Sequence, residues 1–136
     1  MRSRFRLLLL ALTLLAGACG GSGSSAPGAS TARPASTGTL EIVAPENGSS
    51  VADPVTLRVT LEGAKLVPTT TTVVVPNEGH LHVTLDGKLI SMTSGLRQQL
   101  PSLVPGTHVL QVEFVASDHA PFDPRVIASS SFEVSG

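Results

Sequence analysis

The sequence predicts an all-β domain, a sandwich of about seven short strands. Short runs alternate apolar and polar residues, and the clearest is residues 55–61 (VTLRVTL), whose apolar side chains share one face. Asp86-Gly87 joins two such runs and favours a hairpin, because a type I′ turn needs positive φ angles. No run after residue 18 has the 3.6-residue apolar period of an amphipathic helix.

Turn residues separate the expected strands at intervals of about 8–12 positions. The first strand alternates over TLEIV and is followed by a turn that contains Asn47-Gly48. Residues 66–76 are rich in Thr and Val and are expected to form an irregular sheet edge, because Pro68 and Pro76 limit pairing. In order, the seven expected strands are residues 39–43, 55–61, 80–85, 89–92, 96–100, 107–115 and 125–134.

The general form of such a domain resembles an immunoglobulin-like or fibronectin III-like β-sandwich. The chain lacks the Cys pair, the buried Trp and the tyrosine corner of antibody domains, since it has one Cys and no Trp or Tyr. The core is therefore expected to consist of Val, Leu, Ile and the few Phe residues.

The N-terminus has the pattern of a secretory signal. Three arginines precede an apolar stretch over residues 7–15, which is shorter than the roughly 20 residues of a spanning helix. Small residues 16–18 (AGA) then lead to the only cysteine, Cys19. This arrangement resembles the lipobox of bacterial lipoproteins, although Ala16 stands where the family usually has Leu. The resemblance implies a cleaved signal peptide over residues 1–18 and a lipid on Cys19.

A lipid on Cys19 implies a protein anchored to the cell membrane on its extracytoplasmic face. Two or more acyl chains are needed for stable anchoring. Residues 19–38 are then the lipidated cysteine and a flexible linker rich in Gly, Ser, Ala and Pro, because this composition cannot bury enough apolar area to offset its ordering entropy. Residues 39–136 are expected to form the single folded domain.

The charge balance excludes a nucleic-acid-binding surface. Residues 1–18 hold three of the nine basic residues and none of the ten acidic ones, so the remainder carries a net charge of −4. No basic cluster occurs in that part of the sequence. With the single cysteine assigned to the lipid, no internal disulfide is expected.

The histidines form the most informative pattern of the domain. His80 and His82 are two residues apart in one expected strand, so both face away from the apolar side of that strand. If strands 80–85 and 107–115 are antiparallel neighbours, as in immunoglobulin-like sandwiches, both histidines lie beside His119 with Glu113 close by. Imidazole suits copper and zinc, so His80, His82, His119 and Glu113 are candidate metal ligands.

Two further side chains bear on a metal site. His108 falls on the apolar face of its strand and is expected to lie out of reach. Met92 is a softer candidate ligand for Cu(I), with no positional support from the sequence. The alternative is that His80 and His82 cover a sheet face and hydrogen-bond to Thr or backbone groups, with His119 capping its loop.

Three motifs also resemble a family of bacterial proteins. They are residues 76–82 (PNEGHLH), 105–111 (PGTHVLQ) and 118–124 (DHAPFDP). Together they are similar to an uncharacterised family of small extracytoplasmic domains with a G-H-x-H turn, a P-G-x-H-x-L-Q strand and an H-x-P-x-x-P loop. Family members often carry another His where this chain has Leu81. The family has no assigned activity, so the resemblance implies a domain and a histidine grouping but no function.

The sequence holds no motif of an enzyme. It lacks a G-x-S-x-G elbow, a Gly-rich phosphate loop and paired carboxylates. The first hypothesis is a non-enzymatic binding module with an unknown protein or envelope partner, which would use residues 117–124 or the uncharged run 69–75. The alternative hypothesis is a copper- or zinc-binding protein that uses the histidine cluster.

Overall fold

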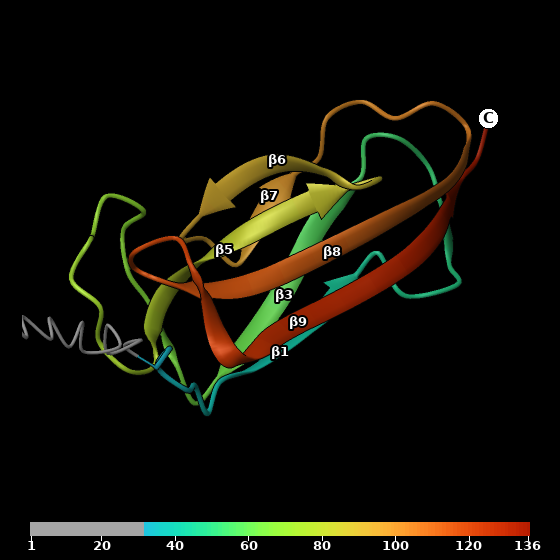
Figure 1. Cartoon of the computed structure of the whole chain (residues 1–136). Coiled ribbons are helices and arrows are strands. Elements are labelled where there is room, and N and C mark those ends of the chain that lie inside the picture. The colour runs from blue at the N-terminus through green and yellow to red at the C-terminus, as the bar shows by residue number, and fades with distance from the viewer. Residues whose placement is uncertain (1–31) are drawn as a thin grey trace, which may run out of the picture. The chain divides into compact units, whose positions relative to one another are not determined.

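A computed structural model describes residues 32–136 (Figure 1). This part of the chain contains nine strands and no helix, and thus no helix that could cross a membrane. The expected signal peptide, Cys19 and most of the expected linker lie outside the described residues.

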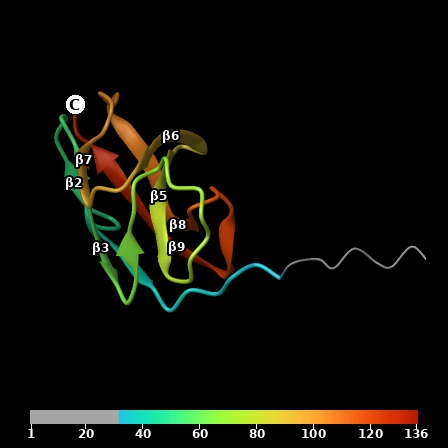
Figure 2. The same cartoon turned by 90° about the vertical axis from the view of Figure 1, so that its left-hand side faces the viewer.

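The strands form two sheets. The smaller sheet has the order β1-β3-β7, and the larger has the order β2-β9-β8-β5-β4, with β6 also paired to β5. Figure 2 shows β3 and β7 on one side of the domain and β5, β8 and β9 on the other. The strands are β1 (Thr39–Ala44), β2 (Ser50–Val51), β3 (Thr56–Glu62), β4 (Lys65–Leu66), β5 (Glu78–Leu85), β6 (Lys88–Thr93), β7 (Arg97–Gln99), β8 (Gly106–Ala116) and β9 (Pro121–Val134).

The predicted all-β sandwich is confirmed. The strand order matches the immunoglobulin-like pattern when the two-residue strands β2 and β4 are left out. Of the seven remaining strands, the first, second and fifth (β1, β3 and β7) form one sheet, and the third (β5) lies beside the sixth (β8). Two pairings of two residues each, β2 with β9 and β4 with β5, had no signal in the sequence. The expected sheet edge over residues 66–76 is wrong, because pairing ends at Leu66 and residues 67–77 form a loop.

The core lies between the two sheets and consists of the alternating apolar residues. Leu57 and Val59 of β3 face the inner side of β5, where Leu81 and Val83 are fully buried. Each such side chain contributes about 1.5–3 kcal/mol through burial of apolar surface. The period of two along each strand therefore decides which residues remain on the outer face of the larger sheet.

Residues 32–38 lie against the domain before the first strand begins. Arg33 forms two hydrogen bonds with Asp118 at 2.6 and 2.9 Å, and Pro34 accepts one from the backbone N–H of Asp123 at 3.0 Å. Asn77 accepts a hydrogen bond from the backbone N–H of Thr37 at 2.7 Å. The last residues of the expected linker are thus fixed to the β8–β9 turn, to the start of β9 and to the end of the β4–β5 loop.

Candidate metal-binding site

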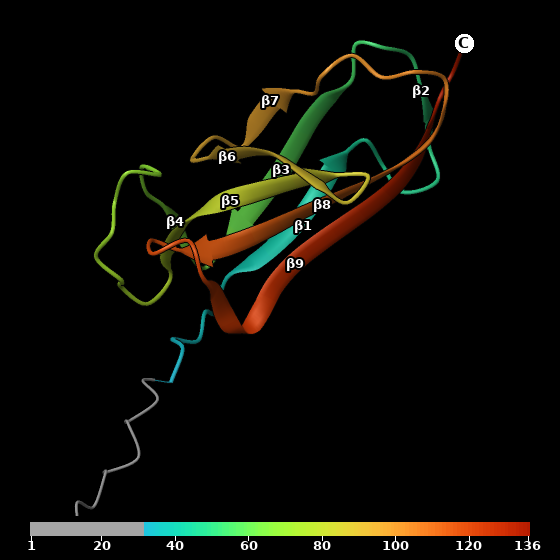
Figure 3. The same cartoon turned by 45° about the horizontal axis from the view of Figure 1, so that its top comes forward.

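The β5–β8 pairing brings together the segments that the sequence predicted to meet. The two strands are antiparallel neighbours (Figure 3). Gly79 lies opposite Ala116, and His82 lies opposite Glu113. Leu81 lies in the core, so the histidines on either side of it face the outer side of the sheet, as predicted.

The turn over residues 117–120 then covers the beginning of β5. This turn carries His119, which has a φ angle of 63°. The left-handed conformation is uncommon for a residue other than Gly. It is held by the hydrogen bond from the His119 N–H to the Ala116 carbonyl at 2.9 Å. His80 lies on the outer face of the sheet as predicted, but it is 0% exposed beneath this turn.

Three imidazoles converge under and beside this turn. Nε2 of His80 and Nδ1 of His119 are 2.9 Å apart and share a hydrogen bond. The ring centroid of His82 lies 5.2 Å from that of His80 and 5.7 Å from that of His119. One nitrogen of each ring lies within 4.8 Å of the others. Two nitrogens on one metal, each at about 2.0–2.1 Å, are separated by at most about 4.2 Å, so the rings would have to move slightly closer together to share an ion.

Two of the ring nitrogens have no hydrogen-bond partner among the described residues. Nδ1 of His80 and Nε2 of His82 are both buried and unpartnered. A buried polar atom without a partner costs about 1–3 kcal/mol, and most such atoms in native proteins are satisfied. Sheet coverage with hydrogen bonds to Thr or backbone groups, the alternative interpretation, leaves these two atoms unexplained.

The surroundings keep His80 and His82 uncharged at neutral pH. Burial, with smaller contributions from the neighbouring His119 and His82, lowers the pKa of His80 from 6.5 to about 4. Burial also lowers the pKa of His82, with His119 acting in the same direction and Glu113 against it. A metal binds the neutral imidazole, so these two rings are ready to bind without losing a proton.

Gly79 allows the two strands to come this close. A Cβ atom at this position would collide with the backbone carbonyl of Val115. On the far side of the turn, Phe122 stacks on Phe114 with ring centroids 5.1 Å apart, which anchors the start of β9 in the core. The position of His119 over His80 therefore depends on the close β5–β8 approach and on this aromatic anchor.

The carboxylates near the cluster are held by basic side chains. Glu113, the fourth candidate ligand, lies opposite His82 but accepts two hydrogen bonds from Arg125 at 2.7 and 2.6 Å. It is not part of the group whose ligand atoms converge. The Arg33 guanidinium beside Asp118 lowers the pKa of that carboxyl to about 2. The structure thus brings together the three histidines and leaves Glu113 engaged elsewhere.

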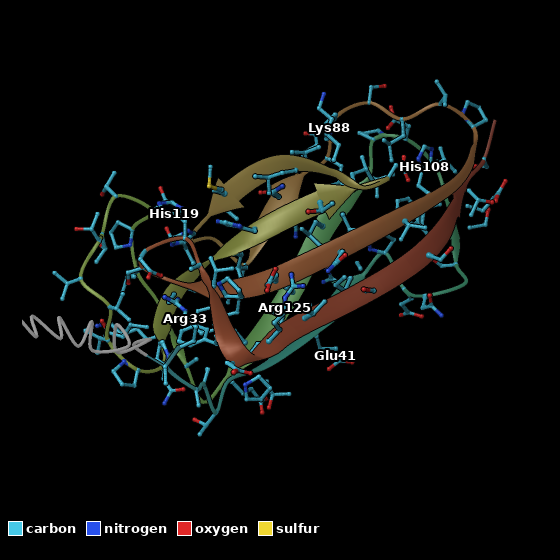
Figure 4. The ribbon with its side chains drawn as sticks, in the orientation of Figure 1. Arg33, Glu41, Lys88, His108, His119 and Arg125 are labelled. Carbon is cyan, nitrogen blue, oxygen red and sulfur yellow. The ribbon has the colours of Figure 1, made fainter. Side chains whose placement is uncertain are left out.

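His108 lies apart from the cluster, as expected. It is buried near the opposite end of β8 from His119, as Figure 4 shows. Its Nδ1 is 2.7 Å from a carboxylate oxygen of Asp86, and its Nε2 is 2.9 Å from the carbonyl oxygen of Val104. Both partners raise the pKa of His108, so this histidine is a structural group that ties the 86–87 hairpin to β8.

Arg33 is the functional candidate that the sequence did not reveal. Its side chain holds the His119 turn through Asp118 and through the carbonyl oxygens of Ala120 and Pro121, at 3.0 and 2.9 Å. Figure 4 shows Arg33 and His119 at the same end of the sheet. Arg33 belongs to a segment with the composition of a linker, and no pattern in that segment distinguishes it.

The β4–β5 loop contains the uncharged run that the sequence pointed out. Val73 is 70% exposed, and Val74 and Val75 are also exposed. Nothing in the described part of the chain covers these three valines.

The chain was compared with models of protein families, with curated proteins and with solved structures, and none of the three comparisons found a match.

Proposed function

We propose that this protein is a non-enzymatic metal-binding protein that holds copper or zinc with His80, His82 and His119. A lipid on Cys19 would keep it on the extracytoplasmic face of the cell membrane. The observation that carries the proposal is the convergence of three imidazoles from two segments, with one nitrogen of each ring within 4.8 Å of the others.

The donor set supports copper or zinc over harder cations. Calcium and magnesium require oxygen ligands. The nearest carboxylates, Glu113 and Asp118, are each bound to an arginine. Three imidazoles remain, and such a set suits zinc and copper. A zinc ion with three protein ligands commonly keeps a fourth position open for water or substrate.

The buried, unpartnered nitrogens support the same conclusion. Depending on the tautomer of each ring, a hydrogen-bond donor, a hydrogen-bond acceptor or a metal would satisfy Nδ1 of His80 and Nε2 of His82. The lowered pKa values of His80 and His82 keep both rings in the neutral form that a metal binds.

Titration calorimetry of the full-length chain with Zn(II) and with Cu(II) tests the proposal. All proteins should carry Cys19→Ser, so that the thiol cannot bind the metal. We expect one metal per chain at micromolar or tighter Kd for the parent and a loss of at least about 100-fold in the His80→Ala/His82→Ala variant, because two of three ligands are removed. His108→Gln is the matched control and should bind like the parent. Binding weaker than about millimolar, or equal binding by the double variant, would exclude the site.

The anchor has its own test. Metabolic labelling with palmitate should mark the wild-type protein and not the Cys19→Ala variant. Equal labelling of the two proteins would remove the lipid from the proposal and leave the metal site untouched.

The exposed valines of the β4–β5 loop favour a second function, that of a binding module for a protein or envelope partner. An exposed apolar patch often marks an interaction site. Cross-linking on intact cells through a reactive group at the exposed position 72 should capture a partner that a Val73→Asp/Val75→Asp variant carrying the same group fails to capture. Identical patterns for both proteins would count against this function.

A further inference from the structure

Met92 occupies the position directly across from His82. Strand β6 pairs with β5 in antiparallel register, with Leu81 opposite Thr93 and His82 opposite Met92. Residues that face each other in such a pair project to the same side of the sheet, with Cβ atoms about 4.5–5.5 Å apart. Since His82 projects to the outer face, the thioether of Met92 starts from the same face.

The side chain of Met92 is free to move toward the cluster. It is 49% exposed, although it is apolar. Three rotatable bonds let a methionine side chain adapt its reach, and its sulfur is polarisable. Of the two methionines in the chain, Met1 lies outside the described residues, so Met92 is the only thioether that the structure places near the histidines.

The other neighbour of His82 cannot serve as the additional ligand. Glu113 flanks His82 on β8, and its carboxylate is held by Arg125 at both oxygens. The two residues that flank His82 on the outer face are therefore Glu113, a hard donor that is already bound to Arg125, and Met92, a soft donor that is free. Soft thioether ligands select Cu(I), whereas hard oxygen ligands favour other cations.

We infer that Met92 supplies a thioether ligand beside the three histidines and that the site thereby prefers Cu(I) to Zn(II). This inference rests on the proposed metal-binding function and names the ion and the fourth ligand. The three rings bind the ion beside the β8–β9 turn, and the thioether completes its coordination from the side of β6.

Competition titrations with a chromogenic Cu(I) chelator, under anaerobic and reducing conditions, test the inference on the full-length Cys19→Ser chain. Met92→Leu keeps the volume and the apolar character of the side chain but removes the sulfur. Its affinity for Cu(I) should fall by about tenfold or more, while its affinity for Zn(II) should stay within about twofold of the parent. Leu89→Ala, which changes another exposed apolar residue of β6, is the matched control and should leave both affinities unchanged.

Copper K-edge absorption spectra of the loaded proteins provide a second readout. A sulfur neighbour of copper should be present in the parent and absent in Met92→Leu. Equal Cu(I) affinities and equal spectra in the two proteins would overturn the role of Met92 and leave a three-histidine site standing. If the parent binds neither Cu(I) nor Zn(II), the proposed function and this inference both fail.

Discussion

His80 and His119 are 39 residues apart in the sequence, yet Nε2 of one lies 2.9 Å from Nδ1 of the other. Two features bring them together, the antiparallel register of β5 with β8 and the left-handed φ of His119 in the turn that follows. One histidine is fully buried in a sheet and the other is exposed on a turn. A metal bound between them would therefore join the turn to the sheet.

Replacement of His119 by Gly separates binding from stability. Gly adopts the left-handed conformation without the cost of about 1–2 kcal/mol that other residues incur. Loss of the hydrogen bond to His80 costs a similar amount, so the free energy of unfolding of metal-free His119→Gly should lie within about 1 kcal/mol of the wild type. Its metal affinity should nevertheless fall by at least about tenfold, because a ligand is lost.

Urea unfolding with a chelator present measures the first quantity, and metal titration measures the second. A loss of stability above about 3 kcal/mol would show that His119 is primarily a structural residue, against the account given above.

Gly79→Ala should disrupt both the sheet and the site. The added Cβ collides with the carbonyl of Val115, and a backbone atom of a central strand cannot move aside as a flexible side chain can. We expect the free energy of unfolding to fall by about 3 kcal/mol or more. Metal binding should also weaken, because His80 is displaced. Gly95→Ala is the control, since its nearest contact, Thr93 Oγ1 at 3.4 Å, leaves room for a methyl group. Equal melting temperatures for the two variants would contradict the close β5–β8 approach.

Acid should destabilise the metal-free protein through His80. The unfolded chain takes up a proton near the ordinary pKa of 6.5, whereas the folded protein resists it down to a pKa of about 4. The unfolded state thus binds more protons within this window, so stability falls as the pH drops from about 6.5 to about 4. Each unit of difference corresponds to about 1.4 kcal/mol, so the difference of about 2.5 between the two pKa values corresponds to a loss of about 3.5 kcal/mol.

His82 acts in the same direction, because its pKa is also lowered. His108 acts in the opposite direction: its raised pKa gives a stabilisation that is present below pH 6.5 and is lost as the pH rises through the raised value. Chemical denaturation at several pH values should show a smaller acid-induced loss in His80→Gln than in the wild type. Parallel curves for the two proteins would argue against a buried, neutral His80.

Arg33 should act as a positioning residue for the metal site. Its guanidinium holds the carboxylate of Asp118 and the carbonyl of Ala120 on either side of His119. Arg33→Ala should weaken metal binding about three- to tenfold with all three ligands present, and Arg33→Lys should restore it only in part, because a lysine lacks the bidentate geometry. Calorimetry on the full-length chain gives the affinities, and an unchanged affinity in Arg33→Ala would mean that the turn is rigid without this contact.

Glu113 offers a test of which donors the metal uses. Because Arg125 holds both of its oxygens, Glu113→Gln should leave the affinity for Zn(II) within about threefold of the wild type. A loss of about tenfold or more would mean that the carboxylate leaves Arg125 and binds the metal.

Much of the architecture was predictable because strand periodicity is a local property. Alternation placed Leu81 in the core and the histidines beside it on the opposite face, and the usual order of a sandwich placed β5 beside β8. The proximity of His80, His82 and His119 then followed from the register of two neighbouring strands.

The remaining features depend on contacts between segments that carry no local pattern. The burial of His80 results from the path of a four-residue turn, and the engagement of Glu113 results from the β8–β9 register, which brings Arg125 within reach. The pairing of Met92 with His82 depends on the register of β6, which includes an irregularity after Val83. A shift of one residue there would have turned Met92 to the other face.

Nitrogen-detected NMR of the four histidine rings tests the central claim most directly. On addition of one equivalent of Zn(II) to the full-length Cys19→Ser protein, the ring signals of His80, His82 and His119 should shift together to those of metal-bound imidazole, while His108 stays unchanged. Unshifted signals for any of the three rings at saturation, or a shift at His108 alone, would contradict the three-histidine site.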